Sequence, residues 1–221
     1  MPHIPLSQAR REDRERPIEL GKTALLSIDM QNAEWSAEMA ADARATGSSK
    51  VDFLDRLEHI VIPNQVRLQS AAREAGLEVI YTVIEALTKD GRDISLDHKI
   101  SGLFFPKGSL EAKVIPAVAP ADDEILIPKT ASGIFNCTNI EYVLRNMGIE
   151  YVVIYGVCTD QCVETAVRDA CDRGFLVTQV EDCCAADDPK RHERSIQAMG
   201  GHYCRMRTTD EMLKELASMR A

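Results

Sequence analysis

The sequence predicts an α/β fold, in which helices cover both faces of one parallel sheet and form three layers in a single domain. Short apolar runs alternate along the chain with segments in which apolar residues recur at helical spacing, as in right-handed βαβ units. A chain of 221 residues is long enough for one domain with a substantial core, and this length disfavours two small domains.

The first half of the chain contains three predicted strands and one long helix. The first strand covers residues 23–29 (TALLSID). After a polar stretch, apolar residues at helical spacing predict a helix over 61–75, which Gly76 ends. The apolar runs at 78–84 (EVIYTVI) and 124–127 predict the second and third strands.

The second half of the chain continues this alternation. The run 151–156 (YVVIYG) predicts a buried fourth strand between a helix over 139–147 and a helix that contains Cys162 and ends at Gly174. The remaining predicted elements are a fifth strand over 175–181, a helix over 191–199, a short sixth strand over 203–206, and a tail helix that opens with the capping box Thr208 and Glu211.

The overall composition disfavours several classes of partner. The formal net charge of −9 argues against nucleic acid and anionic membranes, and no apolar run is long enough to cross a bilayer. Residues 1–20 mix Arg with Asp and Glu and lack the apolar core of a signal peptide, so we expect a polar N-terminal arm before a domain over 21–221. Seven cysteines, an odd number, predict free thiols in a reducing cytoplasm.

Cys162 is a candidate nucleophile. Thr159 or Asp160 stands where the N-cap of its helix belongs, so Cys162 falls in the first helical turn. A cysteine there lies at the positive end of the helix dipole and near unpaired backbone N–H groups. Both favour the thiolate, which is the nucleophilic form. A buried, inert thiol is the alternative interpretation.

Asp29, Lys129 and Cys162 all fall at predicted strand ends. Sites of open α/β sheets form beyond the carboxyl ends of the strands, and a common strand order places strands one and four side by side. In that order Asp29 and Cys162 meet. A thiolate attacks a carbonyl carbon, a carboxylate moves the proton to the leaving nitrogen, and an ammonium keeps the carboxylate ionised. The turn before Cys162 offers backbone N–H groups for the oxyanion.

Three motifs carry a resemblance to a known superfamily. They are LLSIDMQN with Asp29, IPKTASGIFNCTNIEYVLRNMGI with Lys129 and GVCTDQCVETAVRDACDRGF with Cys162, in this order within residues 23–186. With them the chain resembles the isochorismatase-like cysteine hydrolases, the superfamily of nicotinamidase, N-carbamoylsarcosine amidase, ureidoacrylate amidohydrolase and biuret hydrolase.

The resemblance implies a fold, a catalytic triad and an assembly. The fold is a six-stranded, Rossmann-like parallel sheet of order 3-2-1-4-5-6. The triad is Asp29, Lys129 and Cys162. A cis peptide bond before Cys158 is also implied, with the backbone N–H groups of Cys158 and Cys162 directed at the oxyanion. Members are often dimers or tetramers, so a homodimer or homotetramer is expected.

Two departures from the family pattern narrow the expected reaction. Isochorismatases proper lack the nucleophilic cysteine and hydrolyse a vinyl ether, so Cys162 disfavours that activity. Nicotinamidases carry an Asp-x-His…His metal site after strand two, whereas this chain reads YTVIEALTKDGRD there, without a histidine. We therefore expect an amidase without metal or other cofactor, acting on a small linear amide, carbamoyl or ureido compound. The segment KTASGIFNCTN is similar to the pocket lining of ureido-cleaving members, which often have an aromatic residue in place of Ser132.

Four further residues are candidates for contact with the substrate. Trp35, six residues past Asp29, is either an aromatic wall of the pocket or a core anchor. Glu85 ends the second strand and either accepts an amide N–H or is solvated. Asn136 and Thr138 either hydrogen-bond the substrate or cap the following helix.

Two stretches near the predicted site are expected to be loops, and three histidines receive no role. The stretches 33–50 and 87–108 are expected to be loops that shape the pocket at the carboxyl edge of the sheet. His98, His192 and His202 show no ligand spacing, so no role is assigned to them.

Three other functions are compatible with the sequence. The chain is alternatively a binding or scaffold member that keeps the fold without the activity, or a nicotinamidase-type amidase. A redox sensor built on the cysteine-rich edge is a third possibility. A zinc site would need Cys158 and Cys162 together with Cys183 and Cys184, and an adjacent cysteine pair is a poor half of such a site.

Overall fold

One parallel sheet forms the centre of the molecule. The computed structural model describes residues 11–219 of the chain. Within them, six strands pair in the order β3-β2-β1-β4-β5-β6, and each pairing is parallel. The strands are β1 (Thr23–Ile28), β2 (Glu78–Ile84), β3 (Leu126–Lys129), β4 (Tyr151–Val157), β5 (Leu176–Ala185) and β6 (Arg205–Arg207). The predicted fold and strand order are confirmed.

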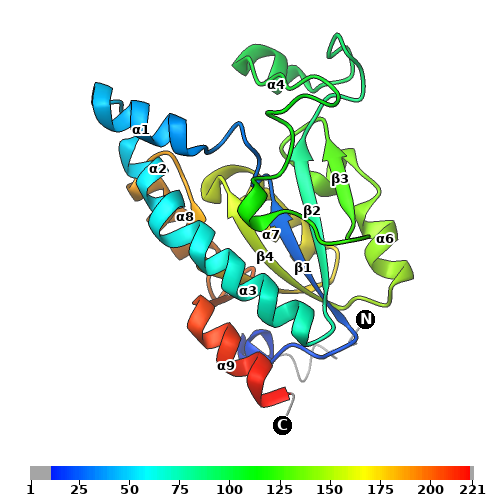
Figure 1. Cartoon of the computed structure of the whole chain (residues 1–221). Helices are drawn as coiled ribbons and strands as arrows, with labels where there is room; N and C mark the ends of the chain where they lie inside the picture. Colours follow the sequence, from blue (N-terminus) through cyan, green and yellow to red (C-terminus); the bar gives the residue numbers. More distant parts are fainter. Residues whose placement is uncertain (1–10, 220–221) are drawn as a thin grey trace.

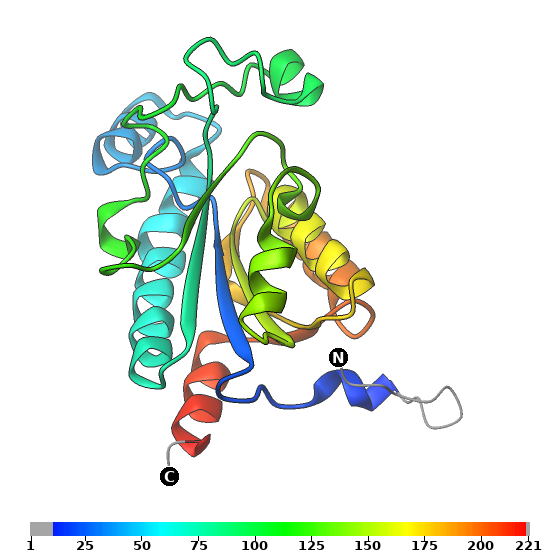
Figure 2. The same ribbon diagram turned by 90° about the vertical axis from the view of Figure 1, so that its right-hand side faces the viewer.

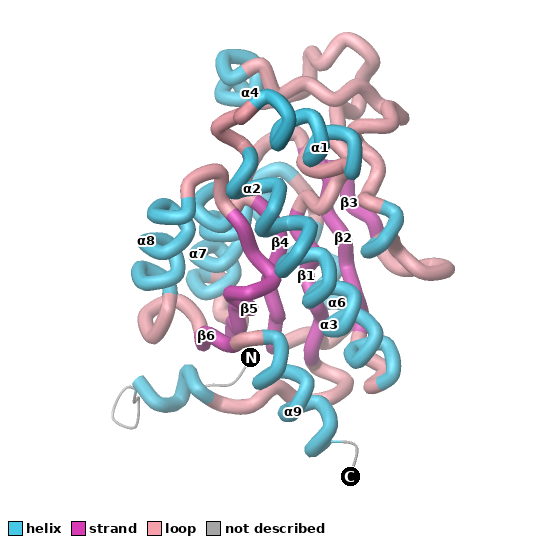
Figure 3. The backbone as a smooth tube through the Cα atoms, turned by 60° about the vertical axis from the view of Figure 1, so that its left-hand side comes forward, coloured by secondary structure: helices cyan, strands magenta, loops and turns pink. Residues whose placement is uncertain are grey.

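Helices cover both faces of this sheet. The α-helices are α1 (Ala37–Thr46), α2 (Val51–Arg56), α3 (Ile62–Glu74), α4 (Leu96–Ser101), α5 (Ile134–Cys137), α6 (Ile140–Asn146), α7 (Glu164–Asp172), α8 (Pro189–Met199) and α9 (Thr209–Met219). With the sheet seen from its edge, α3 lies on one face and α6, α7 and α8 lie on the other (Figure 2). Figure 3 shows α9 beside the lower end of α3, and these two helices are in contact.

Short helical turns connect several of these elements. They are η2 (Arg11–Glu15), the π turn η3 (Leu57–Val61), η4 (Pro116–Val118) and the π turn η5 (Thr159–Val163). The turn η3 joins α2 to α3, so the helix predicted over 61–75 begins earlier than expected.

The central strands explain the continuous apolar runs in the sequence. Every residue of β1 and of β4 is buried, because these two strands are neighbours in the middle of the sheet and helices cover both faces. Their carboxyl ends point toward the part of the molecule that contains α1 and α4 (Figure 1). Side chains that follow β1 and β4 therefore meet at this edge.

The observed strands differ from the predicted ones at some ends. Lys129 is the last residue of β3 rather than the residue that follows a strand ending at Ile127, because the pairing with β2 extends to Ile84 opposite Lys129. The strand β5 continues past residue 181, so Cys183 and Cys184 lie within it.

The helices α1 and α4 form in segments that were predicted to be loops. Each begins at a serine whose side-chain oxygen accepts a backbone N–H of the first turn, Ser36 for α1 and Ser95 for α4. Each ends at a glycine in the left-handed conformation, Gly47 and Gly102. These capping residues are readable in the sequence, but the short helices have no strong apolar periodicity to reveal them.

Both ends of the described chain pack against the domain. Ile18 is buried, and its backbone N–H donates a hydrogen bond of 2.8 Å to the carboxylate of Glu215 on α9. The predicted capping box of α9 is present, since Thr208 N donates to Glu211 at 2.8 Å and Glu211 N donates to Thr208 Oγ1 at 3.3 Å. Residues 1–10 of the predicted arm lie outside the described residues. Over the part that is described, every helix is too short or too polar to cross a membrane.

Gly156 lets β1 and β4 approach each other closely beside the predicted site. Its φ is +129°, and a Cβ at this position would stand 2.1 Å from the backbone oxygen of Ile28. Glycine is therefore required both by the backbone conformation and by the space. One residue further along, the peptide bond between Val157 and Cys158 is cis, at the position that the resemblance implied.

Candidate active site

Three reactive side chains meet at the carboxyl edge of the sheet. Nζ of Lys129 is 2.8 Å from Oδ2 of Asp29 and 3.4 Å from Sγ of Cys162. Lys129 is 0% exposed and Asp29 is 1% exposed, so their ion pair is shielded from water. The structure thus brings together all three residues that the sequence marked as catalytic candidates.

Asp29 is held in place by its neighbour on β2. The Thr82 hydroxyl donates a hydrogen bond of 2.7 Å to Oδ1 of Asp29, and Asp29 N donates to the Thr82 carbonyl at 3.1 Å. Asp29 has a φ of +54°, which few residues with a side chain adopt, so the chain turns sharply after β1. Backbone and carboxylate are both fixed, as a group that transfers protons requires.

Lys129 keeps its positive charge although it is buried. Burial by itself lowers the pKa of Lys129, but the neighbouring Asp29 and Cys162 outweigh this effect, so the pKa is raised above its usual value. Nζ also donates a hydrogen bond of 3.0 Å to the carbonyl of Ala131. The ammonium is a fixed cation that stabilises negative charge on either the carboxylate or the sulfur.

Burial and the nearby Asp29 carboxylate favour the thiol form of Cys162, against the argument that a helix dipole favours the thiolate. Burial and the negative charge of Asp29 raise the pKa of Cys162 to about 12, although Lys129 opposes this shift. Local position in the sequence suggested the dipole, but removal from water and the nearby carboxylate dominate. The sulfur therefore needs a base when it attacks, and Asp29, which binds the same lysine, is the candidate.

The segment that contains Cys162 is the π turn η5 rather than the first turn of an α-helix. Its N-cap residue is Cys158, which makes no side-chain capping bond. The expected caps, Thr159 and Asp160, lie inside the turn and have other partners. Asp160 forms an ion pair with Arg191 of α8, and Thr159 is buried.

A chain of hydrogen bonds from α8 and α2 supports η5. Thr159 Oγ1 is 2.8 Å from Nδ1 of His192 on α8, and the other ring nitrogen, Nε2, is 3.0 Å from the guanidinium of Arg56. Burial and the charge of Arg56 lower the pKa of His192 to about 4, so the ring is neutral at pH 7. Because arginine only donates, Nε2 accepts and Nδ1–H donates to Thr159. His192, which received no role from the sequence, thus positions the turn of the nucleophile.

A cavity of about 110 Å³ lies beside Cys162. Three of its charged lining residues, Glu34, Lys50 and Asp187, were not predicted. The only sequence signal for Glu34 is its place five residues after Asp29 in the same polar segment. The lining residues are Asp29, Glu34, Lys50, Ile84, Leu103, Ser132, Val157, Cys158, Gln161, Cys162 and Asp187.

The four residues predicted to contact the substrate occupy other positions, and none of them is among the described residues that line this cavity. Trp35 is half-buried and packs against the core. The Glu85 carboxylate accepts the backbone N–H of Gly108 at 2.7 Å. Asn136 is exposed, and Thr138 hydrogen-bonds backbone groups of its own helical segments. Contact of these residues with a substrate stays a prediction.

The adjacent cysteines of β5 are packed into the core. Both are fully buried. Sγ of Cys183 lies 3.2 Å from the Thr209 hydroxyl, and the thiol of Cys184 donates to the Val180 carbonyl at 3.2 Å. Cys183 and Cys184 are therefore packing residues of the core.

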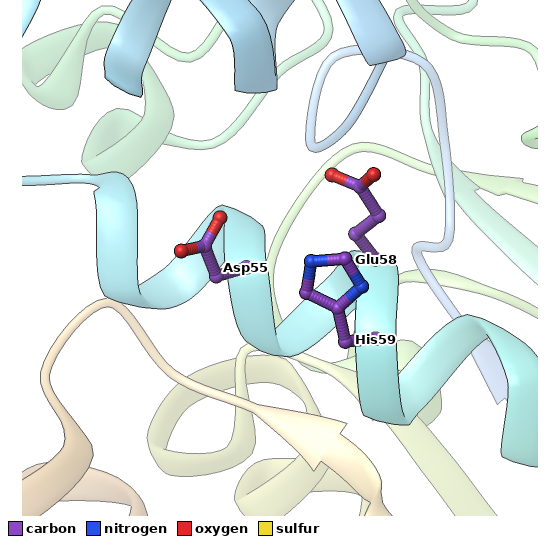
Figure 4. A group of neighbouring side chains, drawn as sticks. All are labelled: Asp55, Glu58 and His59. Carbon is purple, nitrogen blue, oxygen red and sulfur yellow. The ribbon is translucent and has the colours of Figure 1, made fainter.

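One group of side chains within residues 11–219 has a spacing suited to a cation, formed by Asp55, Glu58 and His59 (Figure 4). Arg44 already forms ion pairs with both carboxylates. Its Nε donates to Asp55 at 2.8 Å, and its terminal nitrogen pairs with Glu58. The group is therefore a salt-bridge cluster between α1 and the α2–η3 segment, which its own arginine neutralises.

Comparisons with known proteins agree with the fold. The isochorismatase domain family matches residues 23–211 of the chain. A probable inactive nicotinamidase of Arabidopsis thaliana is 31% identical over 204 residues, which cover 88% of this chain and 96% of the relative. A ureidoacrylate amidohydrolase of Agrobacterium fabrum is 30% identical over 188 residues, which cover 76% of this chain and 79% of the relative. The crystal structure of a cysteine hydrolase from Pseudomonas syringae pv. phaseolicola has the same fold, with a TM-score of 0.77 at 23% identity over 92% of this chain and 96% of that one.

Proposed function

This chain belongs to the isochorismatase family, and we propose that it is a cysteine amidohydrolase that cleaves a C–N bond of a small linear amide, carbamoyl or ureido compound. One observation carries the proposal. A single buried ammonium, that of Lys129, contacts both the carboxylate of Asp29 and the sulfur of Cys162 beside a cavity. The similarity to a ureidoacrylate amidohydrolase supports the same class of bond.

In the first half of the proposed reaction, Cys162 attacks the substrate carbonyl. The S–C bond forms while the thiol proton moves to Asp29, and Lys129 stabilises the negative charge that passes from the carboxylate to the sulfur. The backbone N–H groups of Cys158 and Cys162 are the proposed donors to the oxyanion, and loss of one such donor typically costs about 10²–10³ in rate. The C–N bond then breaks, and the leaving nitrogen takes the proton from Asp29 as ammonia or an amine departs.

In the second half, water releases the product from the sulfur. Asp29, again ionised, takes a proton from water as its oxygen attacks the thioester carbon. The C–S bond breaks, and the proton returns from Asp29 to the Cys162 sulfur. The acid that results leaves, and the site regains a thiol, a carboxylate and an ammonium.

The size of the cavity favours a short substrate. Its volume is about 110 Å³. An apolar cavity of roughly 150 Å³ accommodates benzene, so a compound of about six non-hydrogen atoms fits here. The cavity volume therefore supports a small substrate.

The donor set at the cavity does not suit a nicotinamidase-type metal site. Its described lining contains carboxylates but no imidazole. Asp29 is engaged by Lys129 and Thr82, and Glu85 at the end of β2 is engaged by Gly108. These residues support a reaction in which protons and charge are handled by the three side chains at the edge of the sheet.

The proposal is tested by replacing the nucleophile. We expect the wild-type protein to release ammonia from at least one compound in a panel of ureidoacrylate, biuret, N-carbamoylsarcosine and nicotinamide. The Cys162→Ala variant should lose this activity by more than about 10³-fold while its circular dichroism spectrum is unchanged, because no other group supplies the thioester step. Cys171→Ala, on the following helix, is the control and should retain activity. A Cys162→Ala protein that releases ammonia at the wild-type rate would exclude the mechanism.

A binding or scaffold function is the alternative, because one relative carries the name of a probable inactive nicotinamidase. Intact-protein mass spectrometry after an acid quench separates the two functions. An acyl adduct on Cys162 supports the amidohydrolase, whereas the absence of both adduct and ammonia with every compound of the panel and with the cationic amide glycinamide favours the binding protein.

We also propose that the protein forms homodimers or homotetramers. Leu96 and Ile100 on α4 are 71% and 77% exposed, and Leu110 is 67% exposed in the same segment of the chain. Large apolar side chains that are this exposed often mark contacts between subunits.

A further inference from the structure

Glu34 places an additional carboxyl group in the cavity of the nucleophile. It lies between β1 and α1 and lines the cavity together with Cys162 and Asp187. Among residues 11–219, no hydrogen bond or close ion pair holds its carboxylate. The proposed reaction uses Asp29 for every proton transfer, so Glu34 is available for another task.

The backbone of Glu34 is anchored to the sheet. Its N–H donates a hydrogen bond of 2.9 Å to the carbonyl of Gln31. Gln31 is fully buried, and its side-chain amide accepts from Ile84 N at 2.7 Å and donates to Ile84 O at 3.3 Å. The end of β2 therefore fixes the segment that presents the Glu34 carboxyl group.

The other charges that face Glu34 form two pairs. Lys129 pairs with Asp29 at 2.8 Å, and the nitrogen of Lys50 is 3.9 Å from the carboxylate of Asp187. An ionised Glu34 is thus the one charge of this lining set without its own counterion. Burial and the charge of Asp29 raise the pKa of Glu34 to about 7, so a cation that enters the cavity favours the ionised form.

We propose that Glu34 selects the substrate by binding a positively charged amino or amidino group of a short amide or urea. The inference rests on the proposed amidohydrolase function. A substrate with a carboxylate would meet Glu34, Asp29 and Asp187, whereas a cationic one supplies the missing counterion. Hydrogen bonds between charged groups are stronger than neutral ones, so we expect a preference of about 10- to 100-fold for the cationic compound.

Glycinamide and propionamide test this preference directly. They have the same shape, and an ammonium group in glycinamide replaces a methyl group in propionamide. Malonamate supplies the anionic counterpart. Ammonia release at pH 7.5 should give a kcat/KM for glycinamide at least 10-fold above that for propionamide and higher still relative to malonamate. A wild-type protein that prefers malonamate, or that treats glycinamide and propionamide alike, would overturn the proposal.

The variant Glu34→Gln separates recognition from folding. We expect the ratio of kcat/KM for glycinamide over propionamide to fall to about 1, because the variant loses the charge that distinguishes the two compounds. Glu38→Gln, on the exposed first turn of α1, is the matched control and should keep the wild-type ratio. In the wild type the ratio should also rise as the pH increases from 5.5 to 7.5, because Glu34 ionises in this range. A ratio that Glu34→Gln leaves unchanged contradicts the inference.

A binding measurement keeps this test independent of the reaction. Calorimetric titration of the Cys162→Ala protein with glycinamide and with propionamide needs no turnover. We expect that protein to bind glycinamide at least 10-fold more tightly than propionamide, and the added Glu34→Gln change to remove the difference. This result would show that Glu34 recognises the cation, even if the wild type hydrolyses neither compound. Equal affinity for both compounds overturns the role of Glu34 whether or not the amidohydrolase mechanism holds.

Discussion

At Lys129 the ammonium group makes three polar contacts with the Asp29 carboxylate, the Cys162 sulfur and the Ala131 carbonyl. The side chain is wholly buried, so these contacts replace the hydration that the charge loses on folding. Asp29 depends on the same ammonium and on Thr82. The charges of the site are therefore a structural unit, and removal of one partner leaves the other buried without compensation.

The first prediction at this scale concerns stability. Lys129→Met should lower the free energy of unfolding by about 3–5 kcal/mol, because it leaves the Asp29 carboxylate unpaired in the interior. Urea unfolding followed by circular dichroism measures the effect. The double change Asp29→Asn/Lys129→Met should be clearly less destabilising than the sum of the two single changes, since no unpaired charge remains. A Lys129→Met protein as stable as the wild type would show that the buried pair is not coupled.

The catalytic candidates Asp29, Lys129 and Cys162 could be predicted from the sequence, because each of them occupies a strand end within a recognisable motif. Glu34 and Asp187 could not, because their place at the cavity depends on how the segments after β1 and β5 fold over the sheet. The raised pKa of Cys162 could not be predicted either, for a related reason. Burial is a property of the whole fold, whereas the helix-dipole argument used only the local sequence.

Among the elements, the turn η5 depends most on its neighbours. It receives support from α8 through the contact of His192 with Thr159, and from α2 through the contact of Arg56 with His192. Arg56 also donates a hydrogen bond of 2.9 Å to the carbonyl of Cys184 on β5. Three elements distant in sequence thus fix the backbone that carries the nucleophile.

A pH dependence of stability follows from this arrangement. The pKa of His192 is lowered to about 4 in the folded protein, against roughly 6.5 for an unperturbed histidine. Between these values the unfolded chain binds the proton first, so stability is lost as the pH falls from about 6.5 to about 4, by up to about 3 kcal/mol. At and above pH 7 the contribution is fully present.

Urea unfolding at pH 7, 5.5 and 4.5 measures this contribution. His192→Gln should show a shallower decline with falling pH than the wild type, because its amide does not titrate. The same change at the exposed His202 is the control and should leave the decline unchanged. Identical declines in the wild type and in His192→Gln would disprove the assignment.

Strands were easier to predict than short helices. The runs that became β1 and β4 are apolar throughout because both faces of the sheet are covered. The helices α1 and α4 bury few residues, so their sequences lack the periodicity that identifies an amphipathic helix. The π turn η5 has no sequence signature of its own, and its form is set by contacts with other parts of the fold.

At the scale of the whole molecule, three of the four most exposed large apolar side chains among the described residues lie in one segment. Leu96, Ile100 and Leu110 are more than 60% exposed and belong to the stretch that follows β2. In Figure 1 this stretch stands above the carboxyl edge of the sheet with α4. A subunit contact there would lie next to the entrance of the proposed active site.

The last prediction tests this contact. Leu96→Lys/Ile100→Lys should shift the assembly toward the monomer at micromolar concentration, because two apolar side chains that the proposed contact would bury are replaced by charges. Analytical ultracentrifugation measures the mass. Tyr142→Lys on α6, where the tyrosine is 68% exposed, is the control and should leave the mass unchanged. A wild-type protein that sediments as a monomer would rule out the proposed assembly.

The hydrogen bond between the Glu85 carboxylate and Gly108 N, 2.7 Å long, joins the two ends of the stretch that carries α4. When a hydrogen bond holds the two ends of a loop together, residues between these ends can be inserted, lost or exchanged while the flanking strands stay in register. Insertions and deletions away from Ser95, whose N–H donates a hydrogen bond of 2.9 Å to the Thr130 carbonyl, and away from Leu103, which lines the cavity, would leave Asp29 and Lys129 where they are. Related chains can therefore differ here in loop length and in the subunits they contact, while the catalytic residues at the edge of the sheet stay in place.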